Sequence, residues 1–229
     1  PPAGGAPTPW RRCPRRIFPA GWAGRRVILA FEGVESAFYV WINGHQAGYS
    51  QDSRLTAEFD ITPFLQPGEN TLAAMVIRWS DGSYLEDQDH WWQAGIHRDV
   101  YLYATPLSYI QDAFVYSELS DDFSSAQLHV SALVQSSVTR QIKGSLQVQL
   151  YDPNGTALFA GPQSAPIPAA PIGWQSAPPD DDQRMARLQL KIKAPQLWSA
   201  ETPILYTLVM TMETEHGTMS SAMRIGFRS

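Results

Sequence analysis

The chain has 229 residues, 44% of them hydrophobic and 17% charged, with a formal net charge of −5 at pH 7. This length suits one large or two ordinary domains. The acidic balance argues against a nucleic-acid surface, which needs clustered Lys and Arg. No apolar run approaches the roughly 20 residues of a membrane-spanning helix, so no membrane partner is expected.

Two features of the sequence bear on the compartment. The single cysteine, Cys13, excludes an internal disulfide and is compatible with a reducing compartment. The first residues lack the apolar core of a secretory signal, so a soluble chain in the cytoplasm or an organelle is favoured. Because the chain does not begin with Met, two interpretations stay open: a piece of a longer protein, or a natural short product.

Strand signals dominate the first half of the chain. The run "RRVILAFEGV" (25–34) predicts a strand covered on both faces. In "AFYVWINGHQAGYS" (37–50) the pair Asn43-Gly44 predicts a two-residue hairpin turn, because both residues tolerate positive φ. A Pro67-Gly68 turn precedes a predicted buried strand at 71–79, and "RDVYLYA" (98–104) predicts a further strand before Pro106.

The second half shows cleaner alternation of apolar and polar residues. A period of two with one apolar face predicts half-buried antiparallel strands, as in a sandwich of two sheets. The change near residue 106 places the predicted domain boundary there, giving domains 1–106 and 107–229 in an all-β chain. Residues 161–183, rich in Pro and Ala, predict a long surface loop rather than a strand or helix. The alternating apolar positions are Leu128, Val130, Ala132 and Val134, then Leu146, Val148 and Leu150, then Leu188, Leu190 and Ile192.

The segment "RWSDGSYLEDQDHWWQAGIHRDV" (78–100) gathers acids and large aromatic rings in one predicted loop. Sugars are recognised by aromatic faces that cover their C–H groups and by carboxylates that accept hydroxyl hydrogen bonds. The same oxygens suit a hard cation such as sodium or calcium. The loop therefore predicts a sugar or ion site. The candidate residues are Asp81, Glu86, Asp87, Asp89, Trp79, Tyr84, Trp91 and Trp92.

Structural interpretations of the same residues stay open. The acids fit a solvated turn, and Trp79, at the end of a predicted strand, fits the core. In an extended segment Trp91 and Trp92 point to opposite faces, so at least one is expected to pack inward. His90 follows Glu86 by four residues and could pair with it on a helical turn. Glycoside hydrolysis requires two carboxyl groups facing each other across a bond, and no catalytic residue is assigned in this chain.

Residues 18–103 closely resemble the N-terminal sugar-binding domain of family 2 glycoside hydrolases, specifically the large β-galactosidases. The stretch "EDQDHWWQAGIHRDV" (86–100) looks most like plant and algal members. Two further stretches, "PQLWSAETPILYTLVM" (195–210) and "IGFRS" (225–229), are similar to the closing strands of the immunoglobulin-like domain that follows in that family.

The resemblance implies a jelly-roll (galactose-binding-like) sandwich, incomplete at its N-terminus, followed by an immunoglobulin-like β-sandwich. In the family a TIM barrel with two catalytic glutamates comes next, and this sequence has no counterpart of it. The last Asp of the "EDQD" motif, Asp89 here, is implied to contact galactose and, in the complete enzyme, a sodium ion. We add Trp91 and Asp81 as candidate substrate-binding residues.

The sequence thus predicts a non-catalytic N-terminal part of a β-galactosidase-like enzyme that helps to position galactosides and to assemble the enzyme. Its implied partners are a galactoside or related sugar, the TIM-barrel domain, and further copies in a homo-oligomer or larger assembly. In tetrameric members an arm completes a neighbouring subunit's site; residues 161–183 occupy that place but depart from its pattern. The alternative is a stand-alone carbohydrate-binding or structural subunit.

Overall fold

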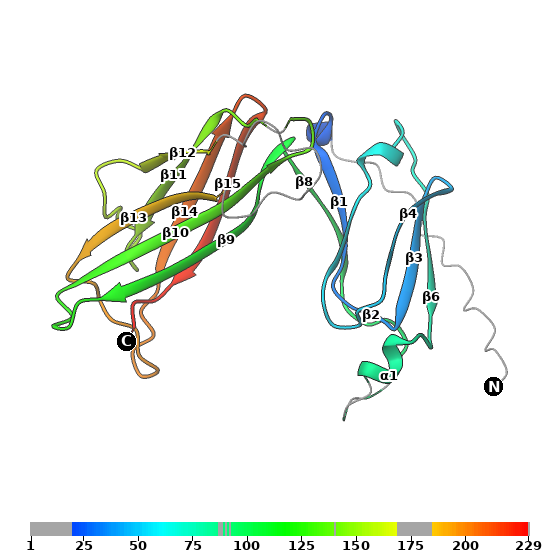
Figure 1. The fold of residues 1–229 in the computed structure, drawn as a ribbon, viewed down its shortest axis with the longest axis horizontal. Helices are drawn as coiled ribbons and strands as arrows, with labels where there is room; N and C mark the ends of the chain where they lie inside the picture. The colour runs from blue at the N-terminus through cyan, green and yellow to red at the C-terminus, as the bar shows by residue number, and fades with distance from the viewer. Residues whose placement is uncertain are drawn as a thin grey trace. The chain divides into compact units, whose positions relative to one another are not determined.

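The computed structural model describes residues 20–86, 89, 91, 93–139, 141–168 and 185–228. The chain divides after Thr105 into two compact units, and each is built from antiparallel strands (Figure 1). The predicted all-β fold class is confirmed. Among the described residues, no helix combines the length and the apolar character that spanning a bilayer requires.

The first unit is a sandwich of two three-stranded sheets with a short two-stranded ladder at one end. One sheet has the order β5-β1-β8, the facing sheet has the order β4-β3-β6, and β2 pairs with β7. Figure 1 shows α1 at the same end of this unit as β2. The elements are η1 (Ala20–Trp22), β1 (Arg26–Phe31), β2 (Val34–Glu35), β3 (Ala37–Ile42), β4 (His45–Ser50), β5 (Ala57–Asp60), η2 (Thr62–Phe64), β6 (Leu72–Ile77), α1 (Gly82–Glu86), β7 (Gly95–Ile96) and β8 (Val100–Thr105).

Strand β1 is the central strand of its sheet. All its residues after Arg26 are buried, which confirms the prediction of a strand covered on both faces. Phe31 at its end packs against Phe38 of β3, with ring centroids 4.8 Å apart, and Phe38 makes an edge contact with Phe59 at 5.7 Å. Gly48 allows this packing, because a Cβ there would overlap the ring of Phe59. These aromatic contacts fix the distance between the two sheets.

The predicted Asn43-Gly44 turn is confirmed. The two residues join β3 to β4 with φ angles of 50° and 83°, as a two-residue hairpin requires. The Asn43 side chain also links the turn to a neighbouring loop: its amide nitrogen donates to the Phe64 carbonyl at 2.8 Å and to Asn70 Oδ1 at 2.7 Å. Its oxygen accepts from the Thr71 N–H at 2.8 Å.

The strand predicted at 71–79 differs from expectation. Strand β6 ends at Ile77, and its residues are half-buried rather than buried, since it lies at the edge of its sheet. Strand β8 occupies an edge of the facing sheet. The inward side chains of both strands are only partly covered, and a cavity of about 280 Å³ opens there between the sheets. Its apolar lining includes Leu29, Ile42, Ile61, Leu65, Leu72, Val100 and Leu102.

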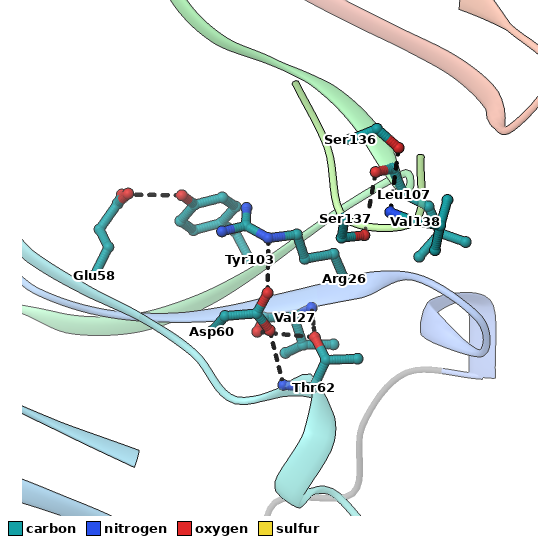
Figure 2. Close-up of polar contacts among 10 residues, drawn as sticks. All are labelled: Arg26, Val27, Glu58, Asp60, Thr62, Tyr103, Leu107, Ser136, Ser137 and Val138. Carbon is teal, nitrogen blue, oxygen red and sulfur yellow. Dashed lines mark hydrogen bonds and ion pairs between the residues drawn. The ribbon is translucent and has the colours of Figure 1, made fainter. Parts of the chain in front are cut away.

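Polar contacts on the outer side of β1 and its neighbours connect strand to turn (Figure 2). Asp60 accepts from Arg26 Nε at 2.8 Å and from the Thr62 N–H at 3.0 Å. On the same sheet Tyr103 donates its hydroxyl to Glu58 at 2.9 Å. Burial, together with this hydrogen bond and the charge of Glu58, raises the pKa of Tyr103 to about 12.

The second unit is a sandwich of a three-stranded and a four-stranded sheet. Their orders are β13-β10-β9 and β12-β11-β14-β15, with every pairing antiparallel. The predicted period-two strands are confirmed, since the alternating apolar residues face one buried cluster. The strands are β9 (Ser108–Leu119), β10 (Ser125–Ser136), β11 (Gly144–Tyr151), β12 (Gln163–Pro166), β13 (Met185–Lys193), β14 (Tyr206–Thr214) and β15 (Gly217–Ile225).

The prediction of a loop without strand over residues 161–183 is wrong at its start. Residues 163–166 form β12, which pairs with β11 from Gln163 opposite Val148 to Pro166 opposite Ser145. Ile167 then enters the core of the unit and is buried. An edge strand tolerates Pro, because one side of its backbone needs no ladder partner. The remainder of that predicted loop lies outside the described residues.

The residues after β15 are tied into the second unit. Phe227 is fully buried, forms a bridge with Leu197, and accepts a backbone hydrogen bond from Trp198 at 2.8 Å. Its ring meets that of Tyr206 edge-on at 5.0 Å. The Tyr206 hydroxyl in turn accepts from the Gln196 N–H at 2.9 Å.

Candidate functional site

The loop between β6 and β7 carries the candidate site. Its described residues are 78–86, 89, 91 and 93–94. It begins with a reciprocal pair in which the Ser83 N–H donates to the Ser80 carbonyl and the Ser80 N–H donates to Ser83 Oγ, both at 3.1 Å. Such side-chain capping satisfies backbone groups at the start of α1, a helix of one turn.

Two acids of the loop are engaged in local contacts. Asp81 accepts from Gln51 Nε2 at 2.8 Å and from the Gly82 N–H at 3.0 Å. Gln51 also accepts from the Tyr49 hydroxyl, so Asp81 belongs to a surface network with β4. Glu86 accepts from the Ser53 N–H at 3.2 Å. These two carboxylates fasten α1 to the segment after β4.

Asp89 and Trp91 lie together in a hollow that Asp81 and Glu86 do not line. They line an open hollow of about 430 Å³ with Gln93, Arg54 and Arg98. Arg98 is fixed there, because its Nη1 donates to the Arg54 carbonyl at 2.9 Å. The Trp91 side chain is 85% exposed. One acid, one glutamine, two arginines and one largely exposed tryptophan thus line the same hollow.

This combination suits a polyhydroxylated ligand. The carboxylate accepts hydroxyl hydrogen bonds, the guanidinium and amide groups donate them, and the tryptophan face can cover a C–H surface. The hollow is open rather than enclosed by this unit, so a ligand held only here would keep much of its surface in water. Among the described residues that line it, the hollow offers recognition groups and a single acid, Asp89.

The structure brings together two of the three predicted substrate-binding residues. Asp89 and Trp91 share the hollow, whereas Asp81 does not line it and is bound to Gln51 instead. The sequence interpretation missed Arg54 and Arg98. Arg98 lies within the predicted loop 78–100 and could have been considered. Arg54 stands 35 residues before Asp89, and only the folded chain places them together.

The aromatic residues of the loop are exposed more than expected. The prediction of Trp79 in the core is wrong: its side chain is 58% exposed, and the Arg78 guanidinium lies 5.2 Å from its ring centroid. Tyr84 is also exposed. The expected pairing of Glu86 with His90, and the expected alternation of Trp91 with Trp92, fall outside the described residues, as does Asp87.

A sodium contact is expected at Asp89. Among the described residues, no group of three or more His, Cys, Asp or Glu side chains is placed to hold a metal ion. Asp89 shares its hollow with Arg54 and Arg98. The sodium contact at Asp89 stays a prediction for the complete enzyme.

The structure places this chain in the class of all-β proteins built from two consecutive sandwiches. The first sandwich carries an open loop with an acid and a tryptophan. The family model described as "Glycosyl hydrolases family 2, sugar binding domain" matches residues 6–106. The model described as "Glycosyl hydrolases family 2" matches residues 108–228. The chain belongs to glycosyl hydrolase family 2.

Curated relatives include β-galactosidases from several bacteria. The chain is 43% identical over 211 residues to the enzyme of Priestia megaterium, covering 91% of this chain and 19% of that protein. It is 46% identical over 204 residues to the enzyme of Vibrio cholerae, covering 88% and 19%. The chain thus spans about a fifth of their length, in their N-terminal part. The plant and algal likeness has no support among these bacterial relatives.

Solved structures agree on the fold. A β-glycosidase from Bacteroides vulgatus superposes with a TM-score of 0.73 at 25% identity, covering 96% of this chain and 26% of that chain. A β-glucuronidase from Parabacteroides merdae gives a TM-score of 0.77 at 20% identity, with coverages of 96% and 27%. These chains are larger glycosidases with parts that this chain does not contain.

Proposed function

We propose that this chain is the non-catalytic N-terminal part of a β-galactosidase, in which it positions the galactoside and helps to assemble the enzyme. The observation that carries the proposal is the hollow in which Asp89 and Trp91 meet, in a chain 43% identical to a β-galactosidase. The bond-breaking carboxyl pair belongs, in this proposal, to a TIM-barrel domain outside these 229 residues.

The role of the hollow follows from its chemistry. Asp89 accepts hydrogen bonds from sugar hydroxyl groups, and the Trp91 ring covers an apolar face of the sugar or of the neighbouring domain. Because the hollow is open, the other walls of the binding site come from the catalytic domain. A sodium ion at Asp89 belongs to the proposal only for the complete enzyme, with its remaining ligands supplied by that domain.

The test makes the same substitution, Asp to Asn, at two positions of one loop in the full-length enzyme and compares the activities. Asp89→Asn is expected to lower kcat/KM for nitrophenyl β-galactoside about 10- to 100-fold, the range for losing hydrogen bonds to a charged group. Asp81→Asn is the matched control, because Asp81 lies outside the hollow, and it should change kcat/KM less than about threefold. Equal effects of the two variants would contradict the role given to Asp89.

A second test uses the isolated chain. It should show no turnover of the same substrate, and galactose titrated in a calorimeter should bind more weakly than millimolar, because one side of a site makes too few contacts. Turnover that Asp89→Ala abolishes would refute the non-catalytic assignment. Tighter galactose binding would favour a stand-alone carbohydrate-binding module, as would a reading frame that stops at Ser229.

A further inference from the structure

The two ends of the loop 78–95 meet at one dipeptide of the first unit. Ser36 contacts the start of the loop, and its neighbour Glu35 contacts the end. We propose that Glu35 and Ser36 form a clasp that positions Asp89 and Trp91. Both are positioning residues, since neither lines the hollow. The inference deepens the proposed function and relies on it for the meaning of the hollow.

The Glu35 carboxylate holds the end of the loop. One of its oxygens, Oε2, accepts from the Gln93 N–H at 2.8 Å and from the Ala94 N–H at 3.2 Å. Glu35 is only 3% exposed, and among the described residues no cation pairs with it. A buried carboxylate is costly unless hydrogen bonds satisfy it, so these two backbone amides are its stabilising partners.

The backbone at the end of the loop is shaped to meet this carboxylate. Ala94 has a φ of 51°, in the left-handed region that a residue with a Cβ seldom adopts, and Gly95 follows with a φ of 103°. Consecutive amides in such a bend can point toward one anion. Gly95 also pairs with Glu35 in the β2–β7 ladder, so backbone and side chain act at the same point.

Ser36 holds the start of the loop. It is fully buried, and its N–H and Oγ both donate to the Ile77 carbonyl, at 3.1 and 3.2 Å. Its hydroxyl lies 2.9 Å from Ser80 Oγ, next to the capping pair of Ser80 and Ser83. The start of α1 is therefore fixed to the same strand segment as the end of the loop.

Asp89 and Trp91 lie between the two held points. Trp91 lies two residues and Asp89 four residues before Gln93, the first amide that Glu35 holds. Releasing Gln93 would let both hollow residues move, while the core strands β1 and β3 keep their packing. The clasp gives a reason for a buried carboxylate under a surface loop that, within the described part of the chain, has backbone amides rather than a cation as its partners.

The test measures amide hydrogen exchange by NMR in this chain, with variants Glu35→Ala and Glu35→Gln. Glu35→Ala should speed exchange of the Gln93 and Ala94 amides about 10- to 100-fold, as expected for lost hydrogen bonds to a charged group. Amides of β3 should change less than about twofold. Glu35→Gln keeps an acceptor oxygen in the same shape and should give an intermediate effect, which serves as the rescue.

A spectroscopic reading reports on the hollow itself. With fluorinated tryptophan, the Trp91 resonance should shift and narrow in Glu35→Ala and stay near its original position in Glu35→Gln. Glu58→Ala is the control, because Glu58 bonds Tyr103 on β8 and does not contact the loop through any hydrogen bond described here. It should leave the Trp91 resonance unchanged.

Two results would overturn the clasp. Unchanged exchange at Gln93 and Ala94 would remove its basis, and equally faster exchange across β3 would show that Glu35 only stabilises the unit. Should Glu35→Ala not fold, the isosteric Glu35→Gln variant decides between the same outcomes. None of these measurements needs a sugar or a catalytic domain, so their failure is distinguishable from failure of the galactoside proposal.

Discussion

Asp122 shows how a turn residue acquires an unusual acidity. Its Oδ1 accepts from Ser120 Oγ at 2.7 Å and from both the N–H and the Oγ of Ser124, at 3.1 and 2.8 Å. The hydrogen bond from Ser120, followed by those from Ser124, lowers the pKa of Asp122 from 3.8 to about 2. The carboxylate thus organises the turn between β9 and β10.

We expect this turn to respond to acid in a defined window. Because the folded-state pKa is depressed, Asp122 contributes stability above about pH 4, and that contribution disappears as the pH falls through about 2. Ser120→Ala should raise the pKa of Asp122 toward 3.8, whereas Ser120→Thr keeps the hydroxyl and should leave it low. Carboxyl carbon NMR titration measures both; a pKa unaffected by Ser120→Ala would contradict the stated cause.

Single residues of the site were only partly predictable. Asp89 and Trp91 are close in sequence and sit in one loop, so composition alone could pair them. Asp81 has the same chemistry, but its contact with Gln51 of a different segment was invisible in the sequence. Arg54 was missed for the same reason, since its approach to Asp89 depends on how the chain folds back after β4.

The β3–β4 hairpin combines an intrinsic turn preference with tertiary hydrogen bonds at Asn43, and substitutions can separate them. Asn43→Gly keeps the positive φ but loses three side-chain hydrogen bonds, so we expect a loss of about 2–3 kcal/mol in unfolding free energy. Asn43→Ala should lose about 1 kcal/mol more, because a Cβ disfavours that φ.

Chemical denaturation of the chain measures both Asn43 variants. Asn43→Asp retains the acceptor for Thr71 but turns a carboxylate oxygen toward two acceptors, the Phe64 carbonyl and Asn70 Oδ1, so it should be no more stable than Asn43→Gly. A Gly variant as stable as the original chain would show that these bonds add nothing net.

Elements were predictable where hydrophobic periodicity is regular. Strand β13 alternates strictly, and β10 and β11 alternate over most of their length, because each has one face on the core. Strand β12 escaped detection because it pairs along one edge only and its short Pro-flanked sequence shows no alternation. Strand β6 was found, but its partial burial could not be, since that depends on where the strand lies in the sheet.

At the scale of the whole molecule, the open side of the first unit dominates the expected behaviour in solution. Within the described residues, β6 and β8 each have one partner strand, and an apolar cavity of about 280 Å³ opens beside them. Unpaired edges beside apolar surface favour association with other chains. We therefore expect the isolated chain to self-associate as its concentration rises through roughly the micromolar-to-millimolar range.

Sedimentation velocity across a dilution series checks this expectation. Leu102→Glu places a charge in the lining of the cavity and should reduce association, provided that circular dichroism shows a retained β-fold. Leu55→Glu adds the same charge at an exposed position outside the lining and should not reduce it. A monodisperse monomer for the original chain at all concentrations would contradict the prediction.

The burial of Phe227 has a practical consequence for anyone who wishes to produce the second sandwich by itself. A version trimmed at Ile225 would retain every strand, yet it would leave an empty space beneath Tyr206 and expose the segment around Trp198. Filling such a space is worth about 3–5 kcal/mol for a phenylalanine ring, a sizeable share of a small domain's stability. The safe place to cut is set by side-chain packing, two residues past the last strand.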